Sequence, residues 1–565
     1  MSRTPLFTAV NRALVLACRD SSIVGPGSSG LTRRRMMGLS AAAAGAAVLS
    51  PVLDWSAYAK NEQLKGPIGI VGGGVAGLTA AYRLHQAGRT PIVFEANNRW
   101  GGRMYTKYDF YKGMFCERGG ELVDSNHLDL MHLLDELGLE LQKFEDEGQA
   151  LYFFKGKFRT DKDILDPKTQ SGAYVPIANR IHDDAQNLGC PDHWTDHARQ
   201  LDNMSLKKYL DQFRGQTIGG KTIDDWVIDL LELAYVNENG LEAEDQSSLN
   251  LVHFIHTALY EDFQIYGDSD EAYRIKGGSS VLINALVNAL VKEKTEMKLN
   301  YALTELDYQG GKIVMRFEAP GGVQTRNFDA VILALPFTKL RQVKGLDRLN
   351  LSCEKLKCIN KLGMGQHAKI MVGTTSRMWR NSSPKPDLPS PDGGINTDLL
   401  GFQDCWETSR GQQPNGGGEA GILTVFLGGN AAEYTKKKHN QKSTFTDFYD
   451  GLHHIWPKMA KSLDTSAVMS MFWSNYPYTL GSYCGAKVGQ YTTMLDEAGK
   501  PALGGRLQFA GEHTAGAKRF GFMNGGVLSG NRAAGELLRL MAPPPEEAVG
   551  DRLSSPATCQ ESPGL

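Results

Sequence analysis

The apolar positions after residue 66 follow a strand pattern first and a helix pattern next. Ile68, Ile70 and Val71 form a short apolar run, and a helical period begins directly afterwards over residues 78–84. A second apolar run follows at 91–94. Strand, glycine-rich turn, helix and strand in this order predict the start of an α/β domain.

The rest of the chain changes from helical to strand periodicity. Residues 127–137 and 223–233 are amphipathic at helical spacing, and most of 128–265 is predicted to be helical. Residues 296–335 alternate between apolar and polar positions, with paired glycines as turns, which predicts hairpin strands. Residues 380–420 are rich in Pro, Gly, Ser and Asn, so we expect a long surface excursion with short strands.

The turn between the first strand and the first helix has the spacing of a dinucleotide site. Gly72, Gly74 and Gly77 fall at G-x-G-x-x-G positions, and Glu95 ends the second strand, where a carboxylate can bind a ribose diol. A lone match among 63 glycines would be weak, but its place between strand and helix disfavours an incidental turn. The candidates in this segment are Gly72, Gly74, Val75, Ala76, Gly77, Glu95 and Ala96.

Two further glycine-rich segments follow the second strand. The first, R-W-G-G-R at 99–103, places two cations around two small residues. Such a loop can set an arginine against a pyrophosphate while its backbone passes close to a flat ring; an exposed basic turn is the alternative. The second, E-R-G-G-E-L at 117–122, again allows close backbone approach. The candidates here are Arg99, Gly102, Arg103, Gly119, Gly120 and Glu121.

Composition and charge limit the classes of function. A chain of 565 residues exceeds one ordinary domain, and 41% hydrophobic with 22% charged residues is a globular composition. The formal net charge of −2 gives no support for a nucleic acid as partner. After residue 60 no apolar run approaches transmembrane length, so no stable membrane insertion of the mature protein is expected.

The first 59 residues have the parts of an export signal. T-R-R-R-M-M at 32–37 precedes a small-residue apolar run at 39–49, and A-Y-A follows at 57–59. Paired arginines before apolar residues resemble a twin-arginine signal peptide. We therefore expect an exported protein, periplasmic or secreted. A disordered arm and a membrane anchor remain alternatives.

The cysteines and the possible metal ligands form no recognisable site. The eight cysteines include no C-x-x-C pair, and no group of His, Cys, Asp and Glu has metal-ligand spacing. In a chain of this size most cysteines are expected to be buried packing residues, with one disulfide as an open option. No metal site is expected.

A further glycine-rich motif lies near the far end of the chain. F-A-G-E-H-T at 509–514 is followed by G-F-M-N-G-G at 521–526. Together with the motifs near residue 72 and residue 99, it resembles the flavin-containing amine oxidase family, which includes monoamine, polyamine and L-amino acid oxidases. The resemblance implies FAD, with the glutamate of the second motif on the ribitol. The flavin-binding residues it adds are Leu303, Trp473, Gly511, Glu512, Gly521, Phe522 and Met523.

The resemblance also implies which side chains surround the reacting amine. Lys369 has Trp379 ten positions on, as does the family's lysine that holds a water against flavin N5. For Lys369 the alternative is a strand lysine that faces solvent. Tyr483 and Phe522 match the positions of an aromatic cage around the substrate amine, and aromatic packing in the core is the alternative for these two residues. Monoamine oxidases carry a flavin-linked cysteine immediately before this tyrosine. Here Ser482 stands there, so non-covalent FAD is expected.

The leading hypothesis from this resemblance is an L-amino acid oxidase. Such an enzyme passes a hydride from Cα to flavin N5 and forms a 2-oxo acid, ammonia and, with molecular oxygen, hydrogen peroxide. Many members bind the substrate carboxylate through an arginine in a G-x-M-R segment, but the corresponding stretch at 119–124 carries acids instead. Arg118 and Arg519 are candidate replacements.

Three other classes remain open. A monoamine or polyamine oxidase is the first alternative, because acids near residue 121 suit a cationic substrate. A desaturase or isomerase that keeps the flavin motifs, and a flavoprotein without turnover, are the others. Peroxide release that depends on an amine substrate would separate an oxidase from these two.

The predicted fold is α/β plus α+β, with a discontinuous Rossmann-type FAD-binding domain and a mixed-sheet and helical substrate domain. A homodimer is left open as the oligomeric state. The expected divisions are 1–59 for the leader, 60–125, 270–335 and 490–540 for the FAD-binding domain, 126–269 and 336–489 for the substrate domain, and 541–565 for a disordered tail.

Overall fold

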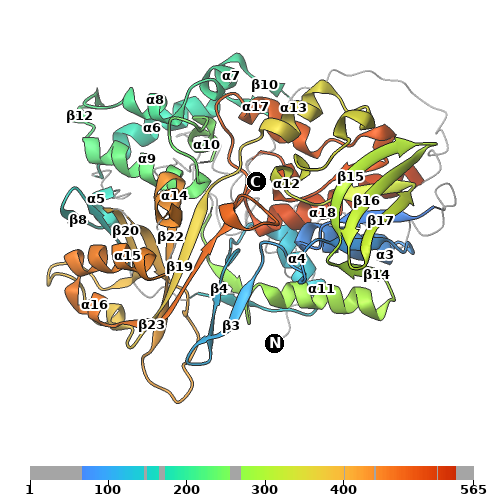
Figure 1. Ribbon diagram of the computed structural model, residues 1–565. Helices are drawn as coiled ribbons and strands as arrows, with labels where there is room; N and C mark the ends of the chain where they lie inside the picture. Colours follow the sequence, from blue (N-terminus) through green and yellow to red (C-terminus); the bar gives the residue numbers. More distant parts are fainter. Residues whose placement is uncertain are drawn as a thin grey trace, which may run out of the picture. The chain divides into compact units, whose positions relative to one another are not determined.

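The computed structural model of the protein describes most of the chain between residues 66 and 541 (Figure 1). The gaps in the described residues are 145–148, 165–171, 192, 255–268, 400, 438–440 and 518. The predicted leader and all but the first residue of the predicted tail lie outside the described part.

A parallel sheet of five strands carries the first glycine motif. Its order is β14-β2-β1-β18-β24, and every neighbouring pair is parallel. The central β1 is buried throughout, as expected for an apolar run covered on both faces. Three distant parts of the chain therefore meet in one sheet. Its strands are β1 (Ile68–Val71), β2 (Ile92–Glu95), β14 (Glu296–Leu299), β18 (Ala330–Leu333) and β24 (Leu507–Phe509).

Two helices pack against each other beside this sheet. One follows the first glycine motif, and the other begins within the G-F-M-N-G-G motif at 521–526. They are α3 (Val75–Gln86) and α18 (Met523–Met541), drawn in blue and red in Figure 1. A Cβ at Gly530 would lie 2.4 Å from the Ala76 carbonyl oxygen, and one at Gly526 would lie 2.7 Å from Val75. The close contact thus requires glycine on α18.

An antiparallel meander packs on the parallel sheet. It consists of β15 (Ala302–Gln309), β16 (Lys312–Ala319) and β17 (Gly322–Phe328), with turns at the predicted glycine pairs. The rings of Phe94 on β2 and Phe317 on β16 are stacked at 4.4 Å. This contact joins the two sheets in one hydrophobic core.

A second large sheet has seven strands in the order β23-β19-β22-β21-β20-β7-β8. Helices α15 (Gln441–Ile455) and α16 (Pro457–Lys461) contribute to the hydrophobic core on this sheet. The strands are β7 (Gln149–Phe154), β8 (Lys157–Arg159), β19 (His367–Thr374), β20 (Pro391–Leu399), β21 (Phe402–Glu407), β22 (Gly421–Gly428) and β23 (Leu463–Phe472).

The expectation of a surface excursion at 380–420 is wrong for much of this segment. Strands β20 and β21 lie inside the seven-stranded sheet, and Ile395, Phe402 and Cys405 are buried in its core. The Gly, Pro and Asn residues that suggested a loop are interspersed with a few large apolar ones. Pairing with neighbouring strands overrides the local preference.

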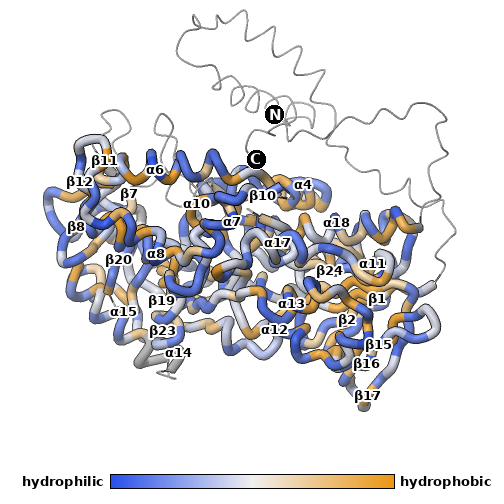
Figure 2. The backbone as a smooth tube through the Cα atoms, turned by 90° about the horizontal axis from the view of Figure 1, so that it is seen from above, coloured by the Kyte–Doolittle hydropathy of each residue, from blue (hydrophilic) through white to orange (hydrophobic). Residues whose placement is uncertain are grey.

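Helices cover the remaining part of the molecule, largely within 128–265 as predicted. In the described part no helix combines the length and the apolar character needed to cross a bilayer. Figure 2 shows hydrophilic and hydrophobic residues mixed along helices such as α15. The helices among the described residues of this region are α4 (Leu128–Glu136), α5 (Asp161–Ile164), α6 (Val175–Gln186), α7 (Asp196–Asp202), α8 (Leu206–Asp211), α9 (Asp225–Asn239) and α10 (Leu249–Val252).

Candidate active site

The glycine turn after β1 leaves open space where a dinucleotide would pass. Gly72 has a φ of +110°, and a Cβ there would lie 2.4 Å from the Ala334 carbonyl oxygen. A Cβ at Gly77 would lie 2.0 Å from the carbonyl oxygen of Gly72. Around Gly74, by contrast, a Cβ would meet nothing within 4 Å. Two glycines therefore allow the turn, and the third faces free space at the N-terminus of α3, as a pyrophosphate site requires.

Glu95 is tied to the glycine turn by both carboxylate oxygens. One oxygen accepts a hydrogen bond from the Gly73 N–H at 2.7 Å, and the other from the Asn97 N–H at 2.8 Å. Burial raises the pKa of Glu95, an effect that these two N–H groups and Arg99 partly offset. The residue lies at the end of β2 and faces the same cavity as the turn.

A cavity of about 730 Å³ extends from this turn to the seven-stranded sheet. Its volume is in the upper range of ligand and cofactor sites. All predicted site residues except Gly77 and Arg99 line it. They are Gly72, Gly74, Val75, Ala76, Glu95, Ala96, Gly102, Arg103, Gly119, Gly120, Glu121, Leu303, Lys369, Trp473, Tyr483, Gly511, Glu512, Gly521, Phe522 and Met523.

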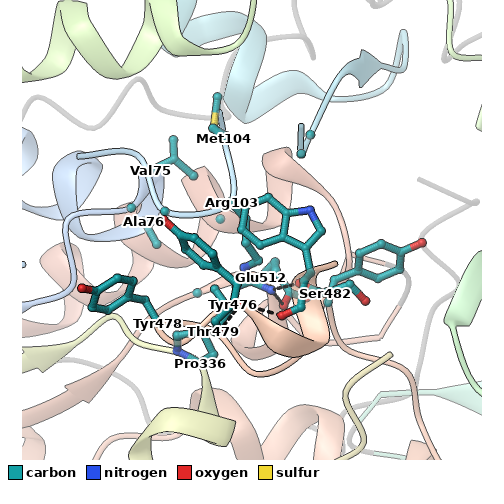
Figure 3. A pocket seen from close by; sticks show the side chains of 18 of the residues that line it. Val75, Ala76, Arg103, Met104, Pro336, Tyr476, Tyr478, Thr479, Ser482 and Glu512 are labelled. Atoms are coloured by element: carbon teal, nitrogen blue, oxygen red, sulfur yellow. Dashed lines mark hydrogen bonds and ion pairs between the residues drawn. The ribbon is translucent and has the colours of Figure 1, made fainter. Parts of the chain in front are cut away.

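The two arginines of the R-W-G-G-R loop have different surroundings. Arg99 donates to the Gly102 carbonyl at 2.6 Å, and its guanidinium lies 3.8 Å from the centre of the Tyr105 ring. It stabilises its own loop and does not line the cavity. Arg103 donates to Glu512 and to the Ser482 carbonyl, both at 2.6 Å, on the cavity wall (Figure 3).

Glu512 joins the two sequence motifs. Besides the ion pair with Arg103, it accepts hydrogen bonds from the N–H groups of Gly521 at 2.8 Å and Cys484 at 3.2 Å. Burial alone would raise the pKa of Glu512, but Arg103 and the hydrogen bonds bring it below its usual value. A buried carboxylate that stays ionised here fixes Gly521 and the start of α18 at the cavity.

Three neighbouring strands of the seven-stranded sheet present one wall of the cavity. Lys369 on β19 is in register with Phe426 on β22, which is in register with Asp404 on β21. Residues two apart on a strand face the same side, so His367 and Trp406 join this wall. All five line the cavity. The sequence indicated only Lys369 among them, because the others lie on strands without a recognisable motif.

Lys369 is buried and held by two oxygen atoms. Its Nζ donates to the Gly119 carbonyl and to Glu121, each at 2.9 Å, and lies 5.2 Å from the centre of the Trp406 ring. Trp379, whose spacing to Lys369 drew attention to the lysine, is in the sheet core, where it donates to Glu407 at 2.9 Å. The ten-residue spacing is present, but Trp406 is the indole at the lysine.

Aromatic rings flank the cavity on two sides. His367 is stacked between Tyr483 at 4.5 Å and Phe426 at 4.8 Å, measured between ring centres. Burial lowers the pKa of His367 to about 4, so this ring is neutral at physiological pH. Phe522 lies in a second group, 4.9 Å from the His127 ring. The structure thus brings the two predicted aromatic residues to one cavity and adds His367 and Phe426.

No thiol lines the cavity in the described part of the chain. Ser482, at the position of the flavin-linked cysteine in monoamine oxidases, donates to the Gly365 carbonyl at 2.7 Å and bonds to His367 at 2.5 Å. Cys484 is fully buried outside the lining and is a free thiol.

Four carboxylates gather around the aromatic groups. Asp124, Glu238, Glu271 and Asp404 all line the cavity. The Tyr483 hydroxyl donates to the Glu238 carbonyl at 2.5 Å, and Asp124 lies 3.2 Å from His127, the neighbour of Phe522. We call these four residues the acidic group.

The members of the acidic group repel one another. Desolvation, and then Asp124, raise the pKa of Glu238 to about 7. Desolvation, and then repulsion by Asp124, Glu238 and Asp404, raise the pKa of Glu271 to about 8. Because the Glu271 side chain is open to the cavity, we assign its shift mainly to the repulsion. The group therefore carries partly protonated carboxyls near neutral pH.

Few cations line the cavity with the acidic group, although Arg410, outside the lining, acts on Glu271 and partly offsets the rise of its pKa. Within the described part of the chain the cationic lining residues are Arg103, Lys339, Lys344 and Lys369. The first is paired with Glu512 and the last with Glu121. The backbone N–H of Lys344 donates to the Thr304 carbonyl, which places Lys344 beside Leu303.

Neither arginine suggested as a carboxylate partner lines the cavity. Arg118 lies over the Tyr105 ring and donates to the Met469 sulfur. Arg519 is exposed. These positions give no support to either residue as an anchor for a substrate carboxylate.

Comparison with known proteins agrees with the geometry of the cavity. The family described as flavin containing amine oxidoreductase matches residues 75–538. The flavin-containing amine oxidase B of Canis lupus familiaris is 25% identical over 85% of this chain and 87% of its own length. The L-amino-acid oxidase of Demansia vestigiata is 23% identical over 84% and 87%.

A solved structure extends the likeness to the fold. Wild-type putrescine oxidase bound to putrescine is 21% identical and has a TM-score of 0.68, covering 84% of this chain and 99% of its own. That fold is the expected one, with a discontinuous FAD-binding part and a mixed-sheet and helical part. With a family match that runs from the end of the first glycine motif through the second flavin motif, this chain belongs to the flavin-containing amine oxidoreductase family.

Proposed function

We propose that the protein is an oxidase that binds FAD non-covalently and acts on small amines carrying a second positive charge, such as diamines. The observation that carries the proposal is the acidic group beside the aromatic rings, with the lining cations Arg103 and Lys369 each paired with another carboxylate. A substrate carboxylate would be repelled there, whereas a second ammonium would be attracted.

Non-covalent FAD is supported by the side chains around Tyr483. The residue before it is a serine engaged in two hydrogen bonds, and the following cysteine is buried away from the cavity. The glycine turn, Glu95 and Glu512 supply the groups that would hold the pyrophosphate, the ribose and the ribitol. When bound, the flavin accepts a hydride from the carbon that bears the amine and is reoxidised by oxygen, which gives hydrogen peroxide.

The chain's own residues prepare the substrate amine. Tyr483 and Phe522 provide apolar faces that orient the amine and exclude water. The reacting amine must be neutral, and a carboxyl of the acidic group near its pKa can take up the proton at Oε of Glu238 or Glu271. Lys369 donates to two protein oxygens, which leaves an N–H for a water in the cavity.

An L-amino acid oxidase is the second candidate. Relatives of that name match this chain over most of its length, and Lys369 and Tyr483 would serve either substrate. This candidate needs an anchor for the carboxylate, and no lining arginine of the described part is free to provide one beside the acidic group.

The test is peroxide and ammonia release by the FAD-loaded protein with diamines, polyamines, monoamines and L-amino acids. We expect turnover of diamines or polyamines, with weaker turnover of monoamines. Turnover confined to L-amino acids would overturn the proposed substrate class and establish the second candidate. A flavin-loaded protein that forms no peroxide with any of these would contradict an oxidase of amines altogether.

A further inference from the structure

Glu121 is committed to Lys369 and does not face the cavity as a free acid. Its Oε2 lies 2.9 Å from the lysine Nζ, and its side chain is 3% exposed. Its Oε1 accepts hydrogen bonds from the Trp406 indole at 3.3 Å and from the Thr408 hydroxyl. Burial alone would raise the pKa of Glu121, but Lys369 and these hydrogen bonds bring it below the usual value. The carboxylate is therefore ionised at neutral pH.

The ion pair joins two elements that form opposite parts of the site. Glu121 and Gly119 belong to the loop before β5 (Leu122–Val123), next to Trp473, whereas Lys369 lies on β19. Trp406 and Thr408 follow one face of β21 and its end. Lys369 is thus held by the loop at 119–121, and Trp406 and Thr408 hold the Glu121 carboxylate of that loop in turn. Among the described residues two oxygen atoms accept from the Lys369 ammonium, so one of its three N–H groups is left for another acceptor.

The counter-charge matters because a buried ammonium is costly without one. Removing one partner of a buried ion pair leaves the other desolvated and unpaired, and the neutral form then becomes favoured. A lysine that lost its proton would no longer stabilise negative charge developing in the cavity.

We propose that Glu121 is a positioning residue that keeps Lys369 protonated and fixed on the cavity wall while oxygen is reduced, with Trp406 and Thr408 orienting its carboxylate. This inference rests on the proposed oxidase function. In that reaction oxygen receives two electrons from the reduced flavin together with two protons and becomes hydrogen peroxide. Glu121 itself exchanges no atom or electron with the reactants.

The test is a double-mutant cycle on flavin reoxidation. The FAD-loaded protein, Glu121→Gln, Lys369→Met and the double variant are reduced with dithionite without oxygen and then mixed with oxygen at several pH values. Lys369→Met should slow reoxidation at every pH. Glu121→Gln should slow it by about tenfold or more at high pH and less at low pH, because its lysine deprotonates more readily. The double variant should be no slower than Lys369→Met.

A second measurement separates this role from a purely structural one. The flavin reduction potential should fall in Lys369→Met, which leaves the Glu121 carboxylate without its counter-charge, and should rise in Glu121→Gln at low pH, where the lysine keeps its charge and the negative partner is gone. If Glu121→Gln does not retain FAD, Thr408→Val replaces it in the cycle, with a smaller effect in the same direction. Additive slowing in the double variant, or a reoxidation rate unchanged by Glu121→Gln at every pH, would overturn the inference.

Dithionite reduces the flavin without an amine substrate. The double-mutant cycle can therefore contradict the role of Glu121 without contradicting the proposed substrate class. Conversely, the pattern of the cycle would persist if the enzyme proved to oxidise L-amino acids. A protein that cannot be loaded with flavin at all would instead contradict the proposed function.

Discussion

Glu95 illustrates how one residue serves both the fold and the site. Its two carboxylate oxygens accept hydrogen bonds from the N–H groups of Gly73 and Asn97, which hold the glycine turn against the end of β2. Each oxygen has further acceptor capacity, and the residue lines the cavity. Glu95 therefore stabilises the glycine turn in addition to offering acceptor oxygens for a ribose.

Replacing Glu95 with Ala should weaken FAD binding by about tenfold or more, because two buried N–H groups lose their acceptor at a cost on the order of 1–3 kcal/mol each. The measurement is the dissociation constant for FAD by fluorescence quenching. Glu296→Ala is the control, since this exposed acid lies on the edge strand of the same sheet. An FAD affinity equal to that of the wild type would remove Glu95 from the cofactor site.

Residue-level prediction succeeded for most residues of the motifs and for Lys369, whose signal was its spacing to Trp379. Except for Gly77, the predicted glycines and acids of the two flavin motifs line the cavity because strand, turn and helix place them there. Arg99 does not line the cavity, since a side chain within a motif can turn toward other partners. His367 and Trp406 were missed because they lack a local signal and meet Lys369 only through strand pairing.

At the scale of elements, the acidic group arises from several segments that the sequence separates. Asp124 follows β5, Glu238 lies on α9, Glu271 precedes β13 (Tyr273–Ile275), and Asp404 is on β21. The segment at Glu271 is tied to Asp124, whose carboxylate accepts hydrogen bonds from the Glu271 N–H and the Ser269 hydroxyl, both at 2.9 Å. Only the tertiary fold brings these charges together, so charge patterning along the chain could not reveal them.

The acidic group should make stability fall as pH rises. Glu238 and Glu271 have pKa values raised to about 7 and about 8, against 4.5 without these surroundings. The folded state therefore binds more protons than the unfolded state, and this stabilisation, fully present below about pH 4.5, is lost as pH rises through about 8. Buried histidines such as His367 act in the opposite sense, but below pH 6.5.

The corresponding measurement is the Tm of wild type and Glu271→Gln between about pH 6.5 and 9. The Tm of the wild type should decrease as pH rises across this range, and the Tm of Glu271→Gln should decrease less, because its amide cannot ionise. Glu140→Gln serves as a control, since this acid is exposed and paired with Lys276 at the surface. Equal slopes in wild type and Glu271→Gln would show that Glu271 is not the group that ionises.

The fold class was predictable, but the path of the chain through the second sheet was not. Apolar runs and glycine spacing indicate the parallel sheet, since each strand is short, buried and followed by a marked turn. Strand β20 contains Pro391, Asp392, Gly393 and Gly394 at its start, which favour a loop locally. Its place in the sheet depends on pairing with β7, which is far away in the sequence, and with β21, which lies in the same loop-like segment.

At the scale of the whole molecule, the fold brings a dinucleotide site and an acidic, aromatic-walled site into one cavity. One part is formed by the parallel sheet with α3 and α18, and the other by the seven-stranded sheet with α9. The ion pairs Arg103–Glu512 and Lys369–Glu121 join segments that are hundreds of residues apart. The excess of carboxylates over cations in the cavity lining, rather than the family motifs, separates the proposed substrate class from its alternatives.

The most direct test of this account compares kcat/KM for a diamine and for the monoamine of the same chain length. The account predicts at least about a tenfold preference for the diamine, equivalent to roughly 1.4 kcal/mol from the second ammonium. Asp404→Asn should reduce this preference, because it removes one member of the acidic group. A preference for the monoamine, or equal values for the two substrates, would contradict the role of the acidic group and the function proposed from it.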